Sequence, residues 1–293
     1  MIKLKRRAIS VADAELQRYA HRIARVAVRS LYRELALYPK PGLVSFHDNG
    51  AHRDMDAATF VHSLFALRRY FVSIASAGMR DAGFGELQQL GLDAESRMLR
   101  ATSGINTHRG AIFTLGLLAA ASGHAMAHNI APSDENLRII VADNWSRDLR
   151  AVAVANASTP THGQLMAMHH GITGARGEAL LGFPSVFKIA LPALRSALAR
   201  GAKWDDALLH TFFVLLAETA DTNVLYRGGA AGLHFVQTRA SAFLLRGSVF
   251  QAGWHSHAAS LHRDCSARNL SPGGCADLLA AAWFLHQMQS GQR

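Results

Sequence analysis

Residues 10–42 read SVADAELQRYAHRIARVAVRSLYRELALYPKPG, and this stretch decides the fold class. Its apolar side chains recur at the spacing of one face of an α-helix, namely Leu16, Ile23, Val26, Ala27, Leu31 and Leu35. We expect Ser10 to cap this helix and the helix to run to about Leu37. Two prolines and a glycine follow within residues 38–42, and they cannot continue a helix.

The same helical spacing covers most of the remaining chain. Asp54 or Asp56 is expected to cap a second helix that extends to about Ala77. Further helices are predicted over residues 85–100, 107–127, 133–154, 177–180, 184–200, 204–220, 229–245, 249–263 and 275–289. No segment shows the alternation with β-branched residues that is typical of a strand. The sequence therefore predicts an all-α protein, a single multi-helix domain over residues 1–293 with glycine-rich interhelix loops.

The composition excludes several classes of protein. Hydrophobic residues make up 49% of the 293 residues and charged residues 18%, which is a globular composition. The longest apolar run, Ala111–Ala121, is too short to span a bilayer. The two cysteines, Cys265 and Cys275, cannot form a four-thiolate zinc site or a disulfide framework. We therefore expect a cytoplasmic protein with no membrane partner.

The charge balance points to an anionic partner. The chain has 31 Lys and Arg against 21 Asp and Glu, which gives a formal net charge of +10. This excess fits nucleic acid, nucleotides or a membrane surface. The basic residues are not gathered in one tail with interleaved aromatics, so the usual footprint of nucleic-acid binding is missing. Walker-type, HExxH and GxSxG motifs are also absent from the sequence.

Six loop clusters are more polar and richer in glycine than ordinary connections. They lie at residues 38–45, 49–56, 104–110, 174–178, 218–229 and 271–277. Each cluster alone is explained by a helix stop, a helix cap or a local ion pair. Together, in one all-helical chain, their basic and acidic side chains favour a composite site for a metal-bound polyphosphate.

Two of these loop clusters indicate specific chemistry. The helix start at Gly104–Gly110 offers backbone N–H groups and a positive dipole end that suit a phosphate, and Arg109 adds a guanidinium fork. Glu218 and Asp221 are three residues apart, so at a helix end they share a face and can hold one hard cation.

Several motifs, taken in order along the chain, resemble those of one enzyme family. They are Tyr38-Pro39-Lys40-Pro41-Gly42-Leu43-Val44, Gly50-Ala51-His52-Arg53-Asp54-Met55, Gly104–Gly110, Ala175-Arg176-Gly177-Glu178-Ala179, Asp221-Thr222-Asn223-Val224 and Ser271-Pro272-Gly273-Gly274 with Ala276-Asp277-Leu278-Leu279. Over roughly residues 35–285 the chain resembles the triphosphoribosyl-dephospho-coenzyme A synthase family. Residues 54–60 and 63–67 look most like the branch that serves malonate decarboxylase, with the citrate lyase branch as the alternative.

The resemblance implies an all-helical transferase that joins ATP to the 2′-hydroxyl of 3′-dephospho-coenzyme A and releases adenine. It implies a product that a downstream transferase attaches to the acyl carrier protein subunit of malonate decarboxylase, and no nucleic-acid partner. Two positions depart from the family pattern: Cys275, where Ser is expected, and Tyr226, where His is common. An all-α Mg²⁺-dependent nucleotide hydrolase and a basic nucleic-acid-binding module remain alternatives.

Glycosyl transfer from ATP requires a triphosphate clamp and exclusion of water. Mg²⁺ is the expected cofactor, and the matched motifs imply Glu178, Asp221 and Asp277 as its ligands. The residues expected to bind phosphate or substrate are Lys40, Asn106, Thr107, Arg109, Arg176, Asn223, Arg227, Gly273 and Gly274.

The incoming hydroxyl also requires a base, and departing adenine a proton donor. Asp54 or Asp56 is the candidate base, although helix capping is the more common explanation of aspartates at this spacing. His52 or His108 is the candidate for protonating adenine or binding a phosphate.

Overall fold

The structure is a computed structural model that describes residues 11–155 and 174–290. The predicted cap Ser10 lies outside the described residues. The α-helices are α1 (Val11–Ala36), α2 (Ala57–Met79), α3 (Phe84–Ala101), α4 (Arg109–Ala127), α5 (Asp134–Ala155), α7 (Ala175–Leu180), α8 (Leu191–Ala199), α9 (Trp204–Glu218), α10 (Thr222–Leu245), α11 (Trp254–Ala267) and α12 (Gly273–Ser290). A π-helix, η1 (Ser185–Ala190), and a 3-10 turn, η2 (Ser248–Phe250), complete the described elements. No strand occurs among them, so the predicted all-α class is confirmed.

Two helix starts show how the local sequence sets the boundaries. Asp56 caps α2: its carboxylate accepts the Thr59 N–H at 2.8 Å, and the Thr59 hydroxyl accepts the Asp56 N–H at 3.4 Å. α10 begins earlier than predicted because Asp221 caps it. Its backbone departs from helical geometry at Gly229, with φ +60°, which is where the sequence placed the helix start. Glycine enters this left-handed region without strain.

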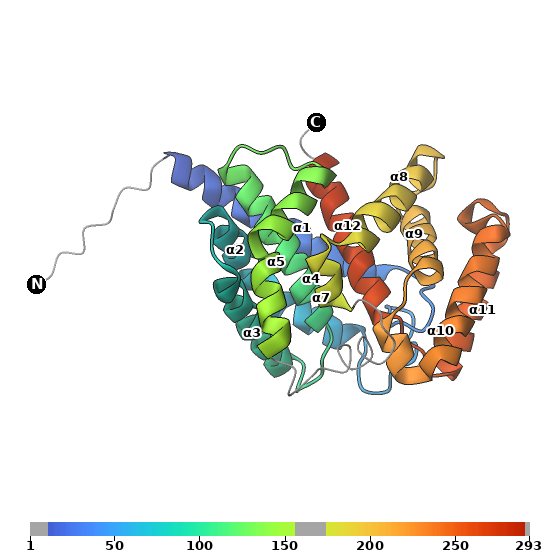
Figure 1. The fold of residues 1–293 in the computed structure, drawn as a ribbon. Helices are drawn as coiled ribbons and strands as arrows, with labels where there is room; N and C mark the ends of the chain where they lie inside the picture. Colours follow the sequence, from blue (N-terminus) through green and yellow to red (C-terminus); the bar gives the residue numbers. More distant parts are fainter. Residues whose placement is uncertain (1–10, 156–173, 291–293) are drawn as a thin grey trace, which may run out of the picture.

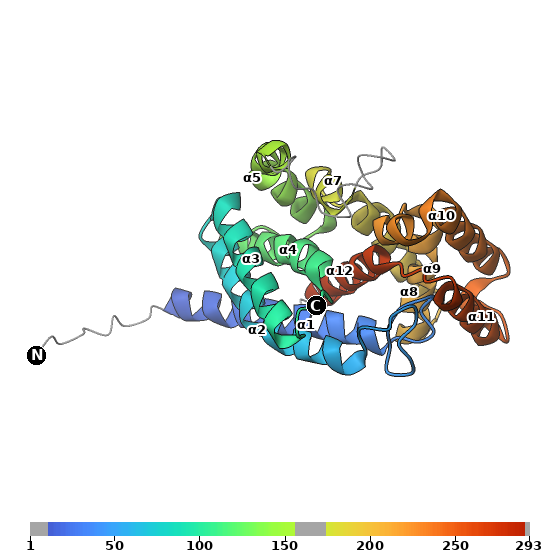
Figure 2. The same cartoon turned by 90° about the horizontal axis from the view of Figure 1, so that it is seen from below.

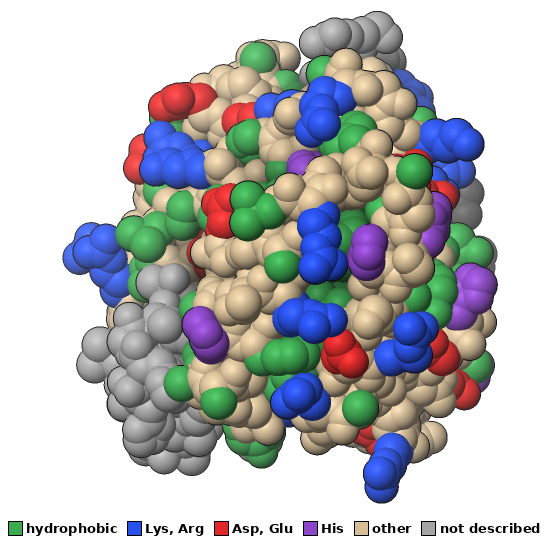
Figure 3. Space-filling view, turned by 90° about the vertical axis from the view of Figure 1, so that its right-hand side faces the viewer, with side chains coloured by type: hydrophobic (Ala, Val, Ile, Leu, Met, Phe, Trp, Pro, Cys, Tyr) green, Lys and Arg blue, Asp and Glu red, His purple; other side chains and the backbone are tan. Residues whose placement is uncertain are grey.

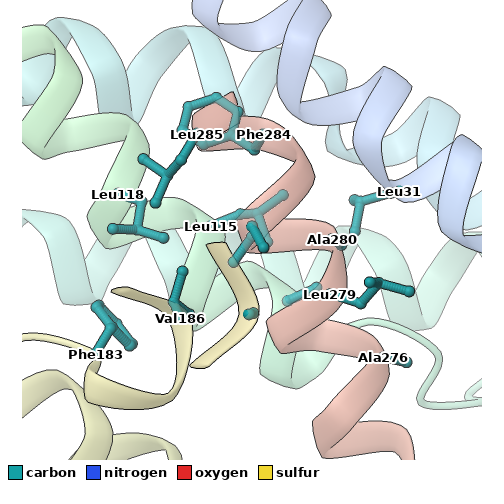
Figure 4. Close-up of a cluster of buried hydrophobic side chains, with 14 of the residues drawn as sticks. Leu31, Leu115, Leu118, Phe183, Val186, Ala276, Leu279, Ala280, Phe284 and Leu285 are labelled. Atoms are coloured by element: carbon teal, nitrogen blue, oxygen red, sulfur yellow. The ribbon is translucent and has the colours of Figure 1, made fainter. Parts of the chain in front are cut away.

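α4 and α12 lie at the centre of the fold (Figures 1 and 2). α12 packs against α1, α4 and α9, and α4 packs against α1, α2 and α5. Side chains from α1, α4, α12 and the segment around η1 form one apolar cluster between these elements (Figure 4). Burial of such side chains is the dominant favourable contribution to folding. α4 is long and apolar enough to cross a membrane, but 72% of its most apolar 18-residue stretch is buried inside the protein, as expected of a core helix.

Two glycines permit close approaches that position the polar loops. A Cβ atom at Gly42, where φ is +69°, would lie 1.9 Å from the carbonyl oxygen of Leu270. A Cβ atom at Gly110 would lie 1.9 Å from Oδ2 of Asp277. The loop after α1 therefore lies against the segment before α12, and a carboxylate of α12 lies against the start of α4.

Candidate active site

Five of the six loop clusters meet at the end of the bundle where α4, α10 and α12 begin, the lower end in Figure 1. Residues far apart in the sequence are in direct contact there. Hydrogen bonds join Ala51 to Arg227, His52 to Ser271 and Asp221 to Cys275. Gly110 packs against the carboxylate of Asp277. The positive charge of Lys40 acts on His108. The helix starts and the loop between α1 and α2 thus form one composite polar site.

Asp221 joins the starts of α10 and α12. One oxygen of its buried carboxylate accepts the N–H groups of Asn223 at 2.8 Å and Val224 at 3.1 Å, and the other accepts the N–H of Cys275 at 2.8 Å. Burial raises the pKa of Asp221, and these hydrogen bonds oppose the rise. The side chain is therefore both a helix cap and a buried acid inside the site.

Asp277 places a second carboxylate at the start of α4. Burial raises its pKa well above the usual range, and the negative charges of Glu34 and Asp221 raise it further. The backbone N–H of Ala111 hydrogen-bonds to Asp277 and opposes this rise. A protein carboxylate therefore uses an N–H group of the first turn of α4, directly after the Gly104–Gly110 segment that the sequence suggested for a phosphate.

Glu34 is a site residue that the sequence analysis missed. It lies near the end of α1, and the Lys40 ammonium donates a hydrogen bond to its carboxylate. Both side chains are buried. Burial lowers the pKa of Lys40, whereas Glu34 raises it. The signal in the sequence was a carboxylate between the apolar stripe residues Leu31 and Leu35.

The ammonium of Lys40 was predicted to bind phosphate. In the structure its partner is Glu34, so the pair carries no net charge toward the site when both groups are ionised. A phosphate would have to share or replace this partner. The phosphate-binding role of Lys40 stays a prediction.

His108 stands at the start of α4 as a buried neutral imidazole. Its Nδ1 lies 2.6 Å from the hydroxyl oxygen of Ser63. Burial, with the positive charge of Lys40, lowers the pKa of His108 to about 3. Its Nε2 has no hydrogen-bond partner among the described residues. His108 can therefore offer a neutral hydrogen-bonding group to a ligand, but not a positive charge at neutral pH.

His52 and Arg227 form a second polar pair within the site. Arg227 Nη2 lies 3.3 Å from His52 Nδ1, and because a guanidinium only donates, this nitrogen is the acceptor. His52 Nε2 then donates to the hydroxyl of Ser271 at 2.8 Å. Burial is the largest cause that lowers the pKa of His52, and the positive charge of Arg227 lowers it further. The carboxylate of Asp54, 3.6 Å from Nδ1, raises this pKa.

Arg227 is anchored by backbone and amide oxygens. Its Nη1 donates to the carbonyl of Ala51 at 3.2 Å and to Oδ1 of Asn269 at 3.0 Å. These bonds hold the guanidinium between α10, the loop before α2 and the loop before α12. Tyr226, the neighbouring departure from the family pattern, is half exposed.

Several predicted site residues lie at the surface instead. Asp54, Asp56, Asn106, Arg109 and Asn223 are exposed. Asp56 is engaged as the α2 cap, and the Asn106 carboxamide caps the N–H of Arg109 at 3.1 Å. The Arg109 guanidinium pairs with Glu95 at 2.6 Å. Such local contacts explain Asp56, Asn106 and Arg109 without a ligand.

Among the described residues, the cluster at residues 174–178 makes no hydrogen bond to the other candidate carboxylates. Both oxygens of Glu178 accept hydrogen bonds from Ser185, from its N–H at 3.0 Å and its hydroxyl at 2.7 Å. Burial raises the pKa of Glu178. Arg176 Nη1 and Thr107 Oγ1 are buried and have no hydrogen-bond partner in the part of the chain that the structure describes. The predicted grouping of Glu178 with the other metal ligands stays a prediction.

The start of α12 packs directly on the start of α10. A Cβ atom at Gly273 would lie 2.7 Å from Nδ2 of Asn223, and one at Gly274 would lie 3.0 Å from Oδ2 of Asp221. The thiol of Cys275 is buried, 3.2 Å from the hydroxyl of Thr219. Burial raises the pKa of this thiol, so it contributes a neutral group.

The fold and the site define the class of protein. Buried carboxylates, a buried lysine and an anchored arginine meet at converging helix starts of an all-α domain, which is the arrangement of an enzyme acting on a charged small molecule. On the face shown in Figure 3, Lys and Arg side chains are spread out with Asp and Glu between them, and form no single basic stripe.

The sequence matches the ATP:dephospho-CoA triphosphoribosyl transferase family over residues 20–293, and the chain belongs to this family. It is 41% identical over 278 residues to the 2-(5″-triphosphoribosyl)-3′-dephosphocoenzyme-A synthase of Pectobacterium atrosepticum, covering 92% of this chain and 87% of the relative. It is 37% identical over 279 residues to the enzyme of the same name from Escherichia fergusonii, covering 92% of each. No solved structure matches the chain. The protein is thus a transferase, as the sequence predicted.

Proposed function

We propose that this protein transfers the triphosphoribosyl group of ATP to the 2′-hydroxyl of 3′-dephospho-coenzyme A and releases adenine. Family membership supports this reaction. The structural observation that carries it is the meeting of Lys40, Asp221 and Asp277, from three separate matched motifs, with Arg227 at one end of the bundle. Two polyanionic substrates require such a collection of charged groups, and the net charge of +10 would draw them toward the protein.

We assign the phosphate-binding role first to Arg227. Its guanidinium is held by the carbonyl of Ala51 and the carboxamide of Asn269, and it is partly accessible. An anchored guanidinium binds phosphate oxygens with little loss of side-chain entropy. The neutral His108 and the buried hydroxyl of Thr107 have hydrogen-bonding capacity left for the same ligand.

We assign the base to Asp54. The carboxylate of Asp56 is committed to the N–H and hydroxyl of Thr59, whereas Asp54 is exposed beside His52 and within the electrostatic reach of Arg227. Asp54 would accept the proton of the incoming 2′-hydroxyl. The positive charge of Arg227, which His52 and Ala51 hold in place, would stabilise the Asp54 carboxylate.

We propose Mg²⁺ as the cofactor, with Asp221 and Asp277 as the residues that hold it. The fit rests on their electrostatics: the negative charges of Glu34 and Asp221 raise the pKa of Asp277, and a cation would relieve this repulsion. Carboxylate oxygens are also the ligands that Mg²⁺ prefers. When bound, Mg²⁺ would neutralise part of the triphosphate charge. Asp221 and Asp277 would hold the cation that binds the triphosphate, and Arg227 would contact the phosphate oxygens directly.

Release of free adenine tests this function. The full chain is incubated with ATP and Mg²⁺, with and without 3′-dephospho-coenzyme A, and adenine is separated by chromatography. The proposal expects adenine only when the acceptor is present, together with a triphosphoribosylated product. Adenine or phosphate released equally without the acceptor would identify a nucleotide hydrolase. Binding to DNA that falls steeply with salt, without any adenine, would identify a nucleic-acid-binding module.

We propose further that the product serves malonate decarboxylase. Support comes from the resemblance of residues 54–60 and 63–67 to that branch. The partners would then be the cytoplasmic transferase that loads the prosthetic group and the acyl carrier protein subunit that receives it. Deleting the gene in its own host should abolish growth on malonate and leave citrate use intact. Loss of citrate fermentation with normal growth on malonate would assign the protein to citrate lyase.

A further inference from the structure

A second polar cluster lies at the other end of α4. His124 and His128 are one helical turn apart on α4, and Asp81 lies in the turn between α2 and α3. Oδ1 of Asp81 is 2.8 Å from His124 Nδ1 and 2.8 Å from His128 Nε2. The three ligand atoms lie within 4.8 Å of one another. Sixteen residues separate His124 from His108, which puts the cluster about 24 Å along the helix from the candidate active site.

The backbone at Asp81 is unusual for an aspartate. Asp81 follows the end of α2 with φ +56°, and the Ala82 N–H bonds to the carbonyl of Ala77 at 3.1 Å while the Asp81 N–H bonds to that of Gly78 at 3.2 Å. This is the Schellman ending, in which glycine is the usual residue at the left-handed position. An acidic side chain is also unfavourable beside the negative end of a helix. The contacts of the Asp81 carboxylate with His124 and His128 offset these costs.

The two imidazoles are arranged around Asp81 as a pair. Their ring centroids are 4.3 Å apart, with 34° between the ring planes. His124 is largely buried, whereas Asp81 and His128 are exposed, so one side of the cluster is open to solvent. Asn144 of α5 reaches the same point, with its amide nitrogen 3.5 Å from His124 Nδ1. Residues from three separate elements thus converge on one position.

We propose that Asp81, His124 and His128 bind a first-row divalent metal ion of the Zn²⁺ type. Two imidazoles and a carboxylate are ligands that such ions take at about 2.0–2.2 Å, with water in the open positions. A tetrahedral ion spaces ligand atoms held at these distances about 3.3–3.4 Å apart, so the present nitrogen-to-oxygen separations of 2.8 Å would widen by about half an ångström on binding. The ion would take the place of the protons now shared between each imidazole and Asp81. Mg²⁺, which prefers oxygen ligands, would not compete well here.

The metal would act as a clamp rather than as part of the transfer reaction. It would fasten the turn between α2 and α3 to the last turn of α4, close to α5. Binding to the folded chain alone stabilises the folded state, so the melting temperature should rise with metal concentration. Adenine release, whose candidate site is at the opposite end of α4, should not require this ion. The two sites can therefore be tested independently.

The test titrates ZnCl₂ into the tag-free, metal-stripped full chain by calorimetry, and repeats the titration with His124→Ala/His128→Ala. The matched control is His255→Ala/His257→Ala, which removes two exposed histidines of α11. The wild type and the control should bind one more equivalent of Zn²⁺ than the cluster variant. Co²⁺ should give a visible ligand-field band in the same two proteins and not in the variant.

Two further measurements guard against misfolding. Asp81→Asn keeps a side-chain oxygen and should fold normally, yet weaken Zn²⁺ binding by about 10-fold or more. Helical circular dichroism and adenine release should match the wild type in all variants. Equal numbers of Zn²⁺ equivalents in the wild type and the cluster variant would overturn the proposal. A wild type that binds no Zn²⁺ would equally overturn it and leave Asp81 as a hydrogen-bonded partner of two histidines.

Discussion

The site residues predicted from the sequence fall into a buried group and an exposed group, and the two differ in the range of their contacts. Asp221, His108 and Lys40 are buried, and each interacts with a residue of another loop cluster or element. Asp56 and Arg109 are exposed, and helix capping or a surface ion pair explains them. Burying a charge or a polar group is costly unless it is compensated. The buried group is therefore the part of the pattern that helix stability alone does not explain.

The largest effect is expected from breaking the buried ion pair. Lys40→Met leaves Glu34 buried without its partner, which should lower the free energy of unfolding by about 3–5 kcal/mol. Urea unfolding followed by circular dichroism measures it. The double variant Lys40→Met/Glu34→Gln should recover part of the stability, because no unpaired charge remains. A Lys40→Met variant as stable as the wild type would show that this ion pair does not set the buried residues apart from the exposed ones.

The next effect concerns the anchored guanidinium. Arg227→Gln removes the proposed phosphate contact, so kcat/KM for ATP should fall by about 10-fold to 100-fold, which corresponds to about 1.5–3 kcal/mol for a charged hydrogen bond. Arg246→Gln, which changes an exposed arginine at the end of the same helix, is the control. Initial rates of adenine release give both values. Equal values for the two variants would remove Arg227 from the clamp.

A pH effect separates the buried His108 from exposed histidines. Its pKa is about 3 in the folded protein against 6.5 in an unfolded chain, so the unfolded state binds more protons between these values. The contribution of the neutral His108 to the free energy of unfolding is therefore fully present above pH 6.5 and is lost as the pH falls toward 3. His108→Asn should make this loss shallower by up to about 1.4 kcal/mol per pH unit. Urea unfolding across that range checks it, and an unchanged slope would contradict a buried neutral His108.

The smallest effect belongs to the exposed group. Asp56→Ala removes the cap of α2 and should cost about 1 kcal/mol of stability. The turnover of the folded enzyme should stay near that of the wild type, because the described hydrogen bonds of the Asp56 carboxylate stay within the start of α2. Thermal unfolding and adenine release measure the two quantities. A large loss of turnover without loss of stability would return Asp56 to the list of candidate bases.

Helical periodicity was sufficient to predict most of the fold, because apolar side chains at helical spacing have to face a core. The stripe containing Ile23 and Leu31 is buried in α1 as predicted. The π-helical geometry of η1 was not predictable, since its residues fit an α-helix equally well. α10 starts earlier than predicted because the sequence alone does not distinguish a capping aspartate from a metal ligand at Asp221.

The candidate site was predictable only in part. Motifs located the loop clusters, but which side chains meet depends on contacts between distant segments. Glu34 was missed because its one signal, an acid between two apolar stripe residues, is also explained by a position at the edge of an amphipathic helix. The contact of Asp277 with Gly110 spans 167 residues of sequence, and only the packing of α12 on α4 brings the two together. Glu178 was grouped with Asp277 by motif, whereas its hydrogen-bond partner is Ser185.

The most direct test compares Asp277→Asn with Asp56→Asn in the adenine-release assay with ATP, Mg²⁺ and 3′-dephospho-coenzyme A. Both changes replace one carboxylate by an amide of the same shape, one partly buried at the start of α12 and one exposed at the start of α2. We expect Asp277→Asn to lose about 100-fold or more in turnover while remaining folded, and Asp56→Asn to stay close to the wild type. Near-normal turnover by a folded Asp277→Asn would contradict the assignment of the active site to the carboxylates of Asp221 and Asp277.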